Sequence, residues 1–247
     1  MTIHIVIPAR YASSRLPGKP LADIGGKPMI VRVARQAALS MADSVVVAVD
    51  DERVAAAVTA DGWQAEMTRS DHVSGSDRVM EVAELRGWSD EDIVVNVQGD
   101  EPLVPSSVID QLCQGMLNQP DVAMATLSEP LQHPADFLDP NVVKVVANEA
   151  GLAMLFSRAP IPYPRESAGK ALPPQAARHV GIYGFRVAAL RQFIGLGEST
   201  LERTEMLEQM RWLQAGLPLL VIEAKQRVPG GVDTPEDLAR VQALFSP

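Results

Sequence analysis

The strongest constraint on the fold is a series of short apolar runs that alternate with amphipathic stretches through the first half of the chain. Runs such as 45–49 (VVVAV) show no alternation of polar and apolar residues. Strands of this kind are buried on both faces, as in a mostly parallel sheet with helices on both sides. The pattern predicts strands over 3–7, 44–49, 64–67 and 93–97, and helices over 28–40, 51–61, 77–86 and 105–118.

The second half of the chain has a different pattern, from about residue 121. Its apolar runs follow one another with few helical stretches between them, which indicates an antiparallel extension of the sheet. The prolines of 159–164 (APIPYP) exclude a central strand there, because proline cannot donate to the ladder. The predicted strands are 123–127, 142–147, 153–156, 180–185 and 219–223, and the predicted helices are 203–214 and 235–245. The expected fold class is α/β, with a Rossmann-like, mostly parallel central sheet flanked by helices.

Length, charge and cysteine content narrow the class of protein further. The 247 residues contain no Pro-, Gly- or Ser-rich linker, so one domain over 1–247 is favoured. A formal net charge of −9 argues against a surface for nucleic acid or an anionic membrane. No apolar run approaches the roughly 18 residues of a membrane span, and the first residues lack a signal-peptide pattern, which together predict a soluble, cytoplasmic protein. The lone cysteine, Cys113, excludes an internal disulfide and is expected to be a small buried hydrophobe.

A basic loop follows the first predicted strand. Arg10, Arg15 and Lys19 stand among small residues there, although the chain as a whole is acidic. Arginine binds phosphate oxygens in pairs and lysine acts as a point charge, so the three cations can surround a polyphosphate. The loop matches neither a Walker loop nor a dinucleotide fingerprint, and side chains must therefore supply most of the positive field. The structural alternative is a surface loop with scattered basic residues.

A carboxylate follows the predicted strand 93–97. Gly99 permits a sharp turn and a close backbone approach, and Pro102 ends the strand, so Asp100 is held at the edge of the sheet where open α/β folds bind ligands. A hard cation such as Mg²⁺ prefers a few carboxylates together with substrate phosphates. Asp100 is thus a candidate metal ligand, and a turn or helix-capping aspartate is the alternative.

Asp233 is the second candidate metal ligand. Thr234 before Pro235 predicts a helix N-cap, and Asp237 can reach back as the third helical residue. Because Thr234 does the capping, Asp233 is left to bind a metal jointly with Asp100.

Three further segments carry polar groups. The turn 74–78 (SGSDR) could contact a base edge or could simply cap a helix, and the sequence leaves both interpretations open. The four histidines show no metal-ligand spacing, but His179 stands beside groups suited to a polar ligand. A helix around 204–213 is expected to bury a stripe and to place Glu208 and Gln209 on a polar, usually solvated face. The residues of the stripe are Met206, Leu207, Met210 and Leu213.

Seven segments occur in an order typical of one family. They are 7–10 (IPAR), 15–21 (RLPGKPL), 26–30 (GKPMI), 96–102 (NVQGDEP), 156–158 (FSR), 178–183 (RHVGIY) and 231–238 (GVDTPEDL). With them the chain closely resembles the 3-deoxy-manno-octulosonate (Kdo) cytidylyltransferase family of sugar nucleotidyltransferases, over nearly its whole length. The first two motifs are shared more loosely across sugar nucleotidyltransferases, and the later ones narrow the resemblance to this sugar acid.

The resemblance implies an activity and its partners. CTP and Kdo would give CMP-Kdo and pyrophosphate, with Mg²⁺, in a cytoplasmic homodimer that serves lipopolysaccharide synthesis. The anomeric hydroxyl of Kdo would attack the α-phosphorus in line, without a covalent enzyme intermediate. Residues 1–120 would mainly bind CTP, and residues 121–247 would mainly bind the sugar acid and form the dimer.

The resemblance also implies roles for individual residues. The catalytic residues would be Lys19, Asp100 and Asp233, of which Asp100 and Asp233 would bind metal. The CTP contacts would be Ala9, Arg10, Arg15, Lys19, Ser74, Gly75, Arg78 and Gln98. The Kdo contacts would be Gln98, Arg158, His179, Tyr183, Glu208 and Gln209.

Two other functions share these features. A cytidylyltransferase for an amino-substituted Kdo analogue or another sugar acid could carry every motif, and only substrate competition separates it from the first function. A non-catalytic nucleotide sensor of the same fold is disfavoured, because such a sensor has no need of both Asp100 and Asp233 beside Lys19.

Overall fold

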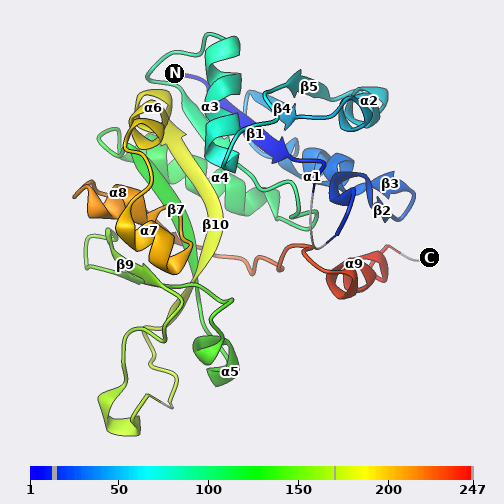
Figure 1. Ribbon diagram of the computed structural model, residues 1–247. Coiled ribbons are helices and arrows are strands. Elements are labelled where there is room, and N and C mark those ends of the chain that lie inside the picture. Colours follow the sequence, from blue (N-terminus) through cyan, green and yellow to red (C-terminus); the bar gives the residue numbers. More distant parts are fainter. Residues whose placement is uncertain (13–15, 170, 246–247) are drawn as a thin grey trace.

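The fold is described from a computed structural model for residues 1–12, 16–169 and 171–245. Within them, nine strands form one sheet in the order β11-β7-β10-β6-β1-β4-β5, and β8 pairs with both β10 and β9 (Figure 1). The sheet strands are β1 (Ile3–Ala9), β4 (Ser44–Val49), β5 (Gln64–Met67), β6 (Ile93–Asn96), β7 (Met124–Pro130), β8 (Lys144–Ala147), β9 (Ala153–Ser157), β10 (Ala177–Arg186) and β11 (Leu220–Glu223).

The helices lie between and around these strands. They are α1 (Met29–Ala37), α2 (Glu52–Ala60), α3 (Gly75–Leu85), α4 (Ser106–Asn118), α5 (Pro134–Leu138), α6 (Val187–Gly195), α7 (Thr200–Glu205), α8 (Met210–Gln214) and α9 (Pro235–Gln242). Short 3-10 helices cover Lys19–Leu21 and Arg165–Ser167, and β2 (Asp23–Ile24) and β3 (Lys27–Pro28) form a separate hairpin. None of the helices formed by the described residues has the length and apolar character needed to span a bilayer.

The strand directions confirm the predicted fold class. Strand β1 runs parallel to β4 and β6, and β4 runs parallel to β5. Strand β10 is antiparallel to β6, β7 and β8, which makes the antiparallel extension. The last strand of the sheet, β11, for which no pairing was predicted, lies parallel to β7.

Both faces of the sheet are covered, which explains the apolar runs without alternation. Ile5 and Ile7 of β1 belong to a core that includes residues of α1, α2 and α4. Val6, between them, belongs to a second core with residues of α3, α6 and α8. Successive side chains of a strand point to opposite faces, so each position of β1 meets an apolar layer. Cys113 is fully buried in α4 and is confirmed as a small core residue.

The predicted helix over 203–214 is wrong as one element, because the chain leaves it at Met206. Met206 has a left-handed φ of 52° and is 75% exposed, whereas Leu207 and Met210 are buried as expected. Arg158 provides the physical reason: its guanidinium donates to the carbonyls of Glu205 and Met206, which a continuous helix would need for itself.

Helix α6 was not predicted from the sequence. Strand β10 ends at Arg186 and α6 begins at Val187, without a glycine or proline to mark the boundary. The apolar residues of both elements therefore look like one run.

The last helix sets the position of Asp233. Helix α9 lies against the β2–β3 hairpin at one end of the molecule (Figure 1), and a small apolar cluster joins them through Ile24 and Val241. Thr234 caps this helix and forms the predicted capping box with Asp237. The packing thereby brings Asp233, one residue before the cap, next to the basic loop that precedes the hairpin.

Candidate active site

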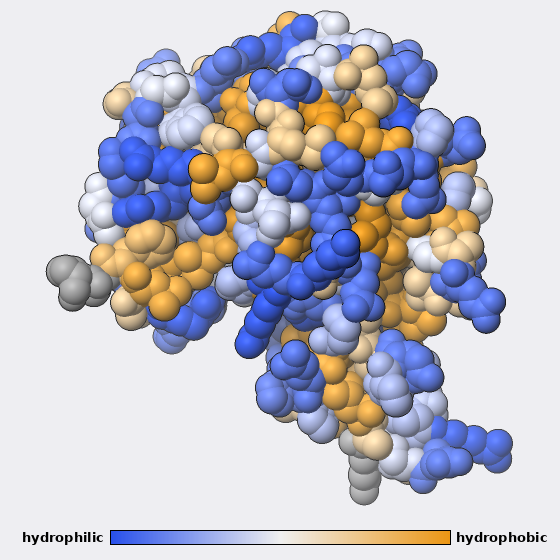
Figure 2. Space-filling model, turned by 180° about the vertical axis from the view of Figure 1, so that it is seen from behind, coloured by the Kyte–Doolittle hydropathy of each residue, from blue (hydrophilic) through white to orange (hydrophobic). Residues whose placement is uncertain are grey.

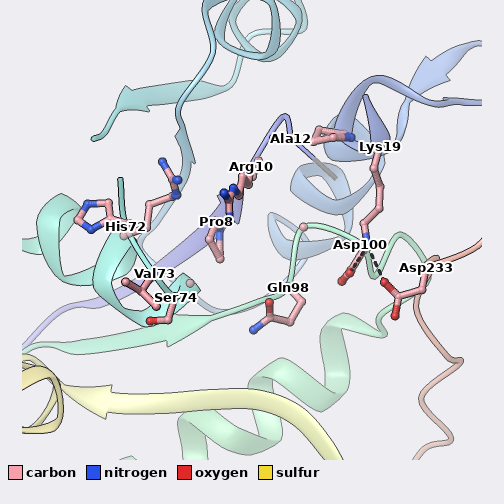
Figure 3. A pocket seen from close by; sticks show the side chains of 15 residues that line it. Pro8, Arg10, Ala12, Lys19, His72, Val73, Ser74, Gln98, Asp100 and Asp233 are labelled. Atoms are coloured by element: carbon pink, nitrogen blue, oxygen red, sulfur yellow. Dashed lines mark hydrogen bonds and ion pairs between the residues drawn. The ribbon is translucent and has the colours of Figure 1, made fainter. Parts of the chain in front are cut away.

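A cavity of about 350 Å³ lies at the carboxyl ends of β1 and β6, the edge at which a ligand site was expected. Its walls come mainly from residues 1–120, with Asp233 from the second half (Figure 3). The lining residues are Pro8, Ala9, Arg10, Ala12, Lys19, Pro20, His72, Val73, Ser74, Gly75, Arg78, Gln98, Gly99, Asp100 and Asp233. The cavity thus gathers every predicted CTP contact except Arg15, which lies outside the described residues.

Lys19, Asp100 and Asp233 converge on one side of this cavity (Figure 3). The ammonium of Lys19 donates to Asp100 Oδ2 at 2.5 Å and to Asp233 Oδ1 at 2.9 Å. The two loops that carry the carboxylates are also joined directly, because the backbone N–H of Val232 donates to the carbonyl of Asp100 at 2.8 Å. Two carboxylates that are far apart in the sequence therefore share one cation.

The charge balance of this group suits a metal. Burial would lower the pKa of Lys19, but the charges and hydrogen bonds of Asp100 and Asp233 outweigh it and hold that pKa above its usual value. The ammonium marks a point between the carboxylates at which a cation is favourable. Three or more His, Cys, Asp or Glu side chains do not come together into a metal cage anywhere in the described chain. Two carboxylates with substrate phosphates are the ligand set of Mg²⁺, so Asp100 and Asp233 could hold this metal.

Gly99 makes the close approach that the sequence predicted. A Cβ atom at this position would lie 2.6 Å from the carbonyl oxygen of Pro8, so only glycine fits between the ends of β6 and β1. Next to Asp100, burial and the negative charge of that residue raise the pKa of Glu101 to about 8. Glu101 is therefore mainly protonated, and uncharged, at neutral pH.

The turn 74–78 caps helix α3, as one of the two interpretations of its sequence predicted. Ser74 is the N-cap, and its side chain and that of Asp77 form a capping box. Ser74 and Gly75 also line the cavity, so capping and a ligand contact are compatible. Arg78 is buried one turn later, where it donates to Thr68 Oγ1 at 2.5 Å and to Asp50 Oδ2 at 3.0 Å. These bonds hold the guanidinium in the cavity wall.

The predicted sugar-acid residues, apart from Gln98, form a separate group, and none of them is among the described residues that line the cavity. His179 and Tyr183 lie on β10 with ring centroids 5.3 Å apart. The pairing of β10 with β7 shifts register between Val180 and Tyr183, and the hydroxyl of Thr126 donates to the carbonyls of Val180 and Ile182 inside this bulge. A bulge of this kind re-aims side chains, here the two rings.

Glu208 and Gln209 are not on a solvated face, contrary to the sequence prediction. Gln209 is only 3% exposed, and Glu208 accepts a hydrogen bond from Ser76 at the start of α3. Burial and the charge of Glu208 raise the pKa of Tyr183, so the carboxylate acts on the phenol of β10. The reason for the error is the break at Met206, which turns the following residues inward.

Arg158 reaches the same group from β9. Its guanidinium donates to the carbonyls of Glu205, Pro140 and Met206, and its own carbonyl accepts a hydrogen bond from the buried ammonium of Lys144. These contacts fix Arg158 at the end of α7, next to the residues that lead into the turn at Glu208.

Some residues of the site were missed from the sequence. They are His72 and Val73, which line the cavity but carry no motif. Ser76 was part of the turn considered above, but nothing in the sequence places it against Glu208. The signal that could have been used is its polarity on the inner side of a helix that otherwise buries apolar residues.

His179 gives a prediction for stability against pH. Burial, with a smaller effect from the charge of Arg178, lowers its pKa from 6.5 to about 3. A group with a lowered folded pKa stabilises the fold above its unfolded pKa, and this contribution is lost as the pH falls from 6.5 toward 3. Urea unfolding should show that wild type loses up to about 2 kcal/mol more than His179→Gln between pH 6.5 and 5. The exposed His133→Gln should behave like wild type, and equal pH slopes for His179→Gln and wild type would contradict the assignment.

Comparisons with known proteins place the chain in a family. The family model described as cytidylyltransferase matches residues 4–224. The 3-deoxy-manno-octulosonate cytidylyltransferase of Cellvibrio japonicus is 51% identical over 99% of this chain and 98% of its own length. That of Pseudomonas syringae pv. tomato is 49% identical over 98% of this chain and 97% of its own. The chain belongs to the 3-deoxy-manno-octulosonate cytidylyltransferase family.

Solved structures agree with this family. A CMP:2-keto-3-deoxy-manno-octonic acid synthetase complexed with CTP has a TM-score of 0.92 and 45% identity, covering 99% of this chain and 98% of that one. A cytidylyltransferase from Leptospira borgpetersenii has a TM-score of 0.63 at 18% identity and shares the fold. The resemblance to the Kdo cytidylyltransferase family stated from the sequence is confirmed.

Proposed function

We propose that the chain transfers CMP from CTP to 3-deoxy-D-manno-octulosonate, giving CMP-Kdo and pyrophosphate, for lipopolysaccharide biosynthesis. The observation that carries the proposal, beside membership of the family, is the convergence of Lys19 with Asp100 and Asp233 at the cavity edge. This arrangement puts an ammonium and two potential metal ligands at one point. A binding module for CTP has no need of the carboxylate pair.

CTP occupies the cavity in this proposal. Its volume of about 350 Å³ is within the range of small-molecule sites. Arg10, Arg15 and Lys19 hold the triphosphate, and Ser74, Gly75, Arg78 and Gln98 lie near the cytidine, with Ala9 forming part of the floor. Because Asp50 holds the guanidinium of Arg78 in place, Arg78 forms a fixed part of the cavity wall and can also donate a hydrogen bond to the nucleotide.

Kdo binds next to the cavity. On its other side lie His179 and Tyr183 of β10 and Glu208 and Gln209 of the turn between α7 and α8. The carboxylate of Kdo requires a cation, and Arg158 is the proposed partner, while His179, Tyr183, Glu208, Gln209 and Gln98 contact its hydroxyls. His179 Nε2 lies 2.9 Å from Thr126 Oγ1. Because that hydroxyl donates its proton to backbone carbonyls, Nε2 carries the hydrogen of the neutral ring and leaves Nδ1 as an acceptor.

The reaction proceeds by in-line attack of the anomeric hydroxyl on the α-phosphorus, with pyrophosphate as the leaving group. Asp100 and Asp233 would hold Mg²⁺, which would supply Lewis-acid chemistry by lowering the pKa of that hydroxyl and screening the phosphate charge. Lys19 offsets negative charge on the phosphoryl oxygens, where a fixed cation acts more strongly than in water. Neither Asp100 nor Asp233 forms a bond to phosphorus.

Pyrophosphate release tests the proposed function. It should require CTP, Kdo and Mg²⁺ together. Release at equal rates with ATP or GTP, or without a sugar acid, would exclude this activity. Competition between Kdo and an amino-substituted analogue at equal concentration measures whether the alternative substrate is preferred.

A homodimer is part of the same proposal, and the projecting segment supports it. The described parts of the segment after β9, 158–169 and 171–176, project from the body of the molecule (Figure 1), and Figure 2 shows hydrophobic residues on the surface of the projecting lobe. Met154 is 64% exposed and Leu155 and Tyr163 are also exposed, which is costly in a monomer. Analytical ultracentrifugation should give twice the chain mass for wild type and less for Met154→Lys. A cytoplasmic location accompanies the proposal because CTP is a cytoplasmic metabolite.

A further inference from the structure

One hydrogen bond joins the two halves of the site. The hydroxyl of Ser76 donates to Glu208 Oε2 at 2.9 Å, across 132 positions of sequence. Ser76 is 2% exposed and lies in the first turn of α3, directly after Ser74 and Gly75, which line the cavity. A buried hydroxyl in this position needs a partner, and it finds one in the opposite half of the chain.

The other oxygen of Glu208 lacks such a partner. Among the described residues, Glu208 Oε1 is buried without a hydrogen bond, and its nearest cation, Arg211, stands 3.8 Å away while donating to Glu202. The neighbouring Gln209 Nε2 is also buried and unbonded in the described chain. A buried acceptor and a buried donor on successive residues are costly when neither is satisfied, and together they point to a polar ligand with hydroxyl groups.

The backbone does not fix Glu208 by itself. Residues 207–209 lie between two short helices, after the left-handed residue Met206. Helix α3, by contrast, has 11 residues and a complete capping box at its start. The hydroxyl of Ser74 belongs to this box and also lies close enough to Glu208 to act on its pKa by hydrogen bonding. Ser76 supplies the bond of 2.9 Å from the rigid helix to the irregular turn.

We propose that Ser76 is a positioning residue for the sugar acid, which holds Glu208 so that its unbonded oxygen faces the substrate hydroxyls. This inference rests on the proposed function. When Ser76 holds Oε2 of Glu208, the carboxylate can no longer rotate freely, and the direction of Oε1 is set as well.

Steady-state kinetics of Ser76→Ala test the proposal. The KM for Kdo should rise roughly tenfold, since a hydrogen bond to a charged group is lost, while the affinity for CTP alone should stay within about twofold. Ser76→Thr keeps the hydroxyl and should restore the KM. Ser76→Cys keeps the volume but donates weakly, so it should resemble Ser76→Ala and serves if the alanine variant is unstable. Ser44→Ala, which removes a hydroxyl bonded to His4 at the other end of the sheet, is the matched control.

A double-mutant cycle separates positioning from a general structural effect. In a Glu208→Gln background, Ser76→Ala should change the KM for Kdo by less than about twofold, because the bond it removes acts through Glu208. An unchanged KM in Ser76→Ala, or the same tenfold rise in both backgrounds, would overturn the proposal. Absence of pyrophosphate release by wild type would instead overturn the proposed function, so the two failures are distinct.

Discussion

Asp100→Asn should lower kcat by a factor on the order of 100 or more, and Asp233→Asn should do the same. Each change removes one negative charge from the pair that faces the reacting phosphate and would hold the metal. The affinity for CTP should change less, because Arg10 and Lys19 still line the cavity proposed to hold the triphosphate. Pyrophosphate release at saturating CTP, Kdo and Mg²⁺ measures kcat, and isothermal titration measures CTP binding.

The fold should survive both substitutions. Asparagine has the shape of aspartate, and its amide oxygen can still accept the hydrogen bond of Lys19, which retains one charged partner in each variant. Asp90→Asn is the matched control, because this carboxylate pairs with Arg191 before the start of β6, at the opposite end of that strand. A variant that keeps near-normal kcat at saturating Mg²⁺ would show that its residue does not hold the metal that acts in the reaction.

The sequence predicted those parts of the fold that depend on local pattern. Strands β1 and β4 were recognisable because helices cover both faces and every position except His4 and Ser44 is apolar. The capping box at Thr234 was recognisable because it uses only neighbouring residues. Helix α6 was missed because no breaker separates it from β10, and the α7–α8 break was missed because it depends on Arg158, some 45 positions away along the chain.

The residues of the site can also be divided into those that local pattern predicts and those that depend on tertiary contacts. Ala9, Gln98 and Asp100 could be placed in advance because they follow parallel strands whose ends share one edge. Asp233 could be proposed only as a partner of Asp100, and its contact with Lys19 depends on the packing of α9 against the hairpin. The burial of Glu208 could not be predicted, because a helical pattern places it on the solvated side and a tertiary contact with Ser76 decides otherwise.

Lys19→Met should lower kcat on the order of 100-fold, because a fixed charge is removed from the phosphoryl oxygens, and it should raise the KM for Kdo much less. The geometry adds a second expectation. The ammonium of Lys19 lies between the carboxylates proposed to bind metal, so Lys19 and Mg²⁺ compete for the same oxygens when no CTP is bound. Without the ammonium, Asp100 and Asp233 repel each other, and the variant should be less stable in EDTA.

Thermal unfolding of the CTP-free protein tests this competition directly. Mg²⁺ should raise the melting temperature of Lys19→Met more than that of wild type, since ligand binding to the folded state stabilises it in proportion to its affinity. Lys27→Met is the matched control, because it removes a lysine from a carboxylate, Asp61, that Arg35 also neutralises outside the cavity. Equal Mg²⁺ shifts for Lys19→Met and wild type would mean that the metal does not bind between Asp100 and Asp233, whatever the effect on kcat.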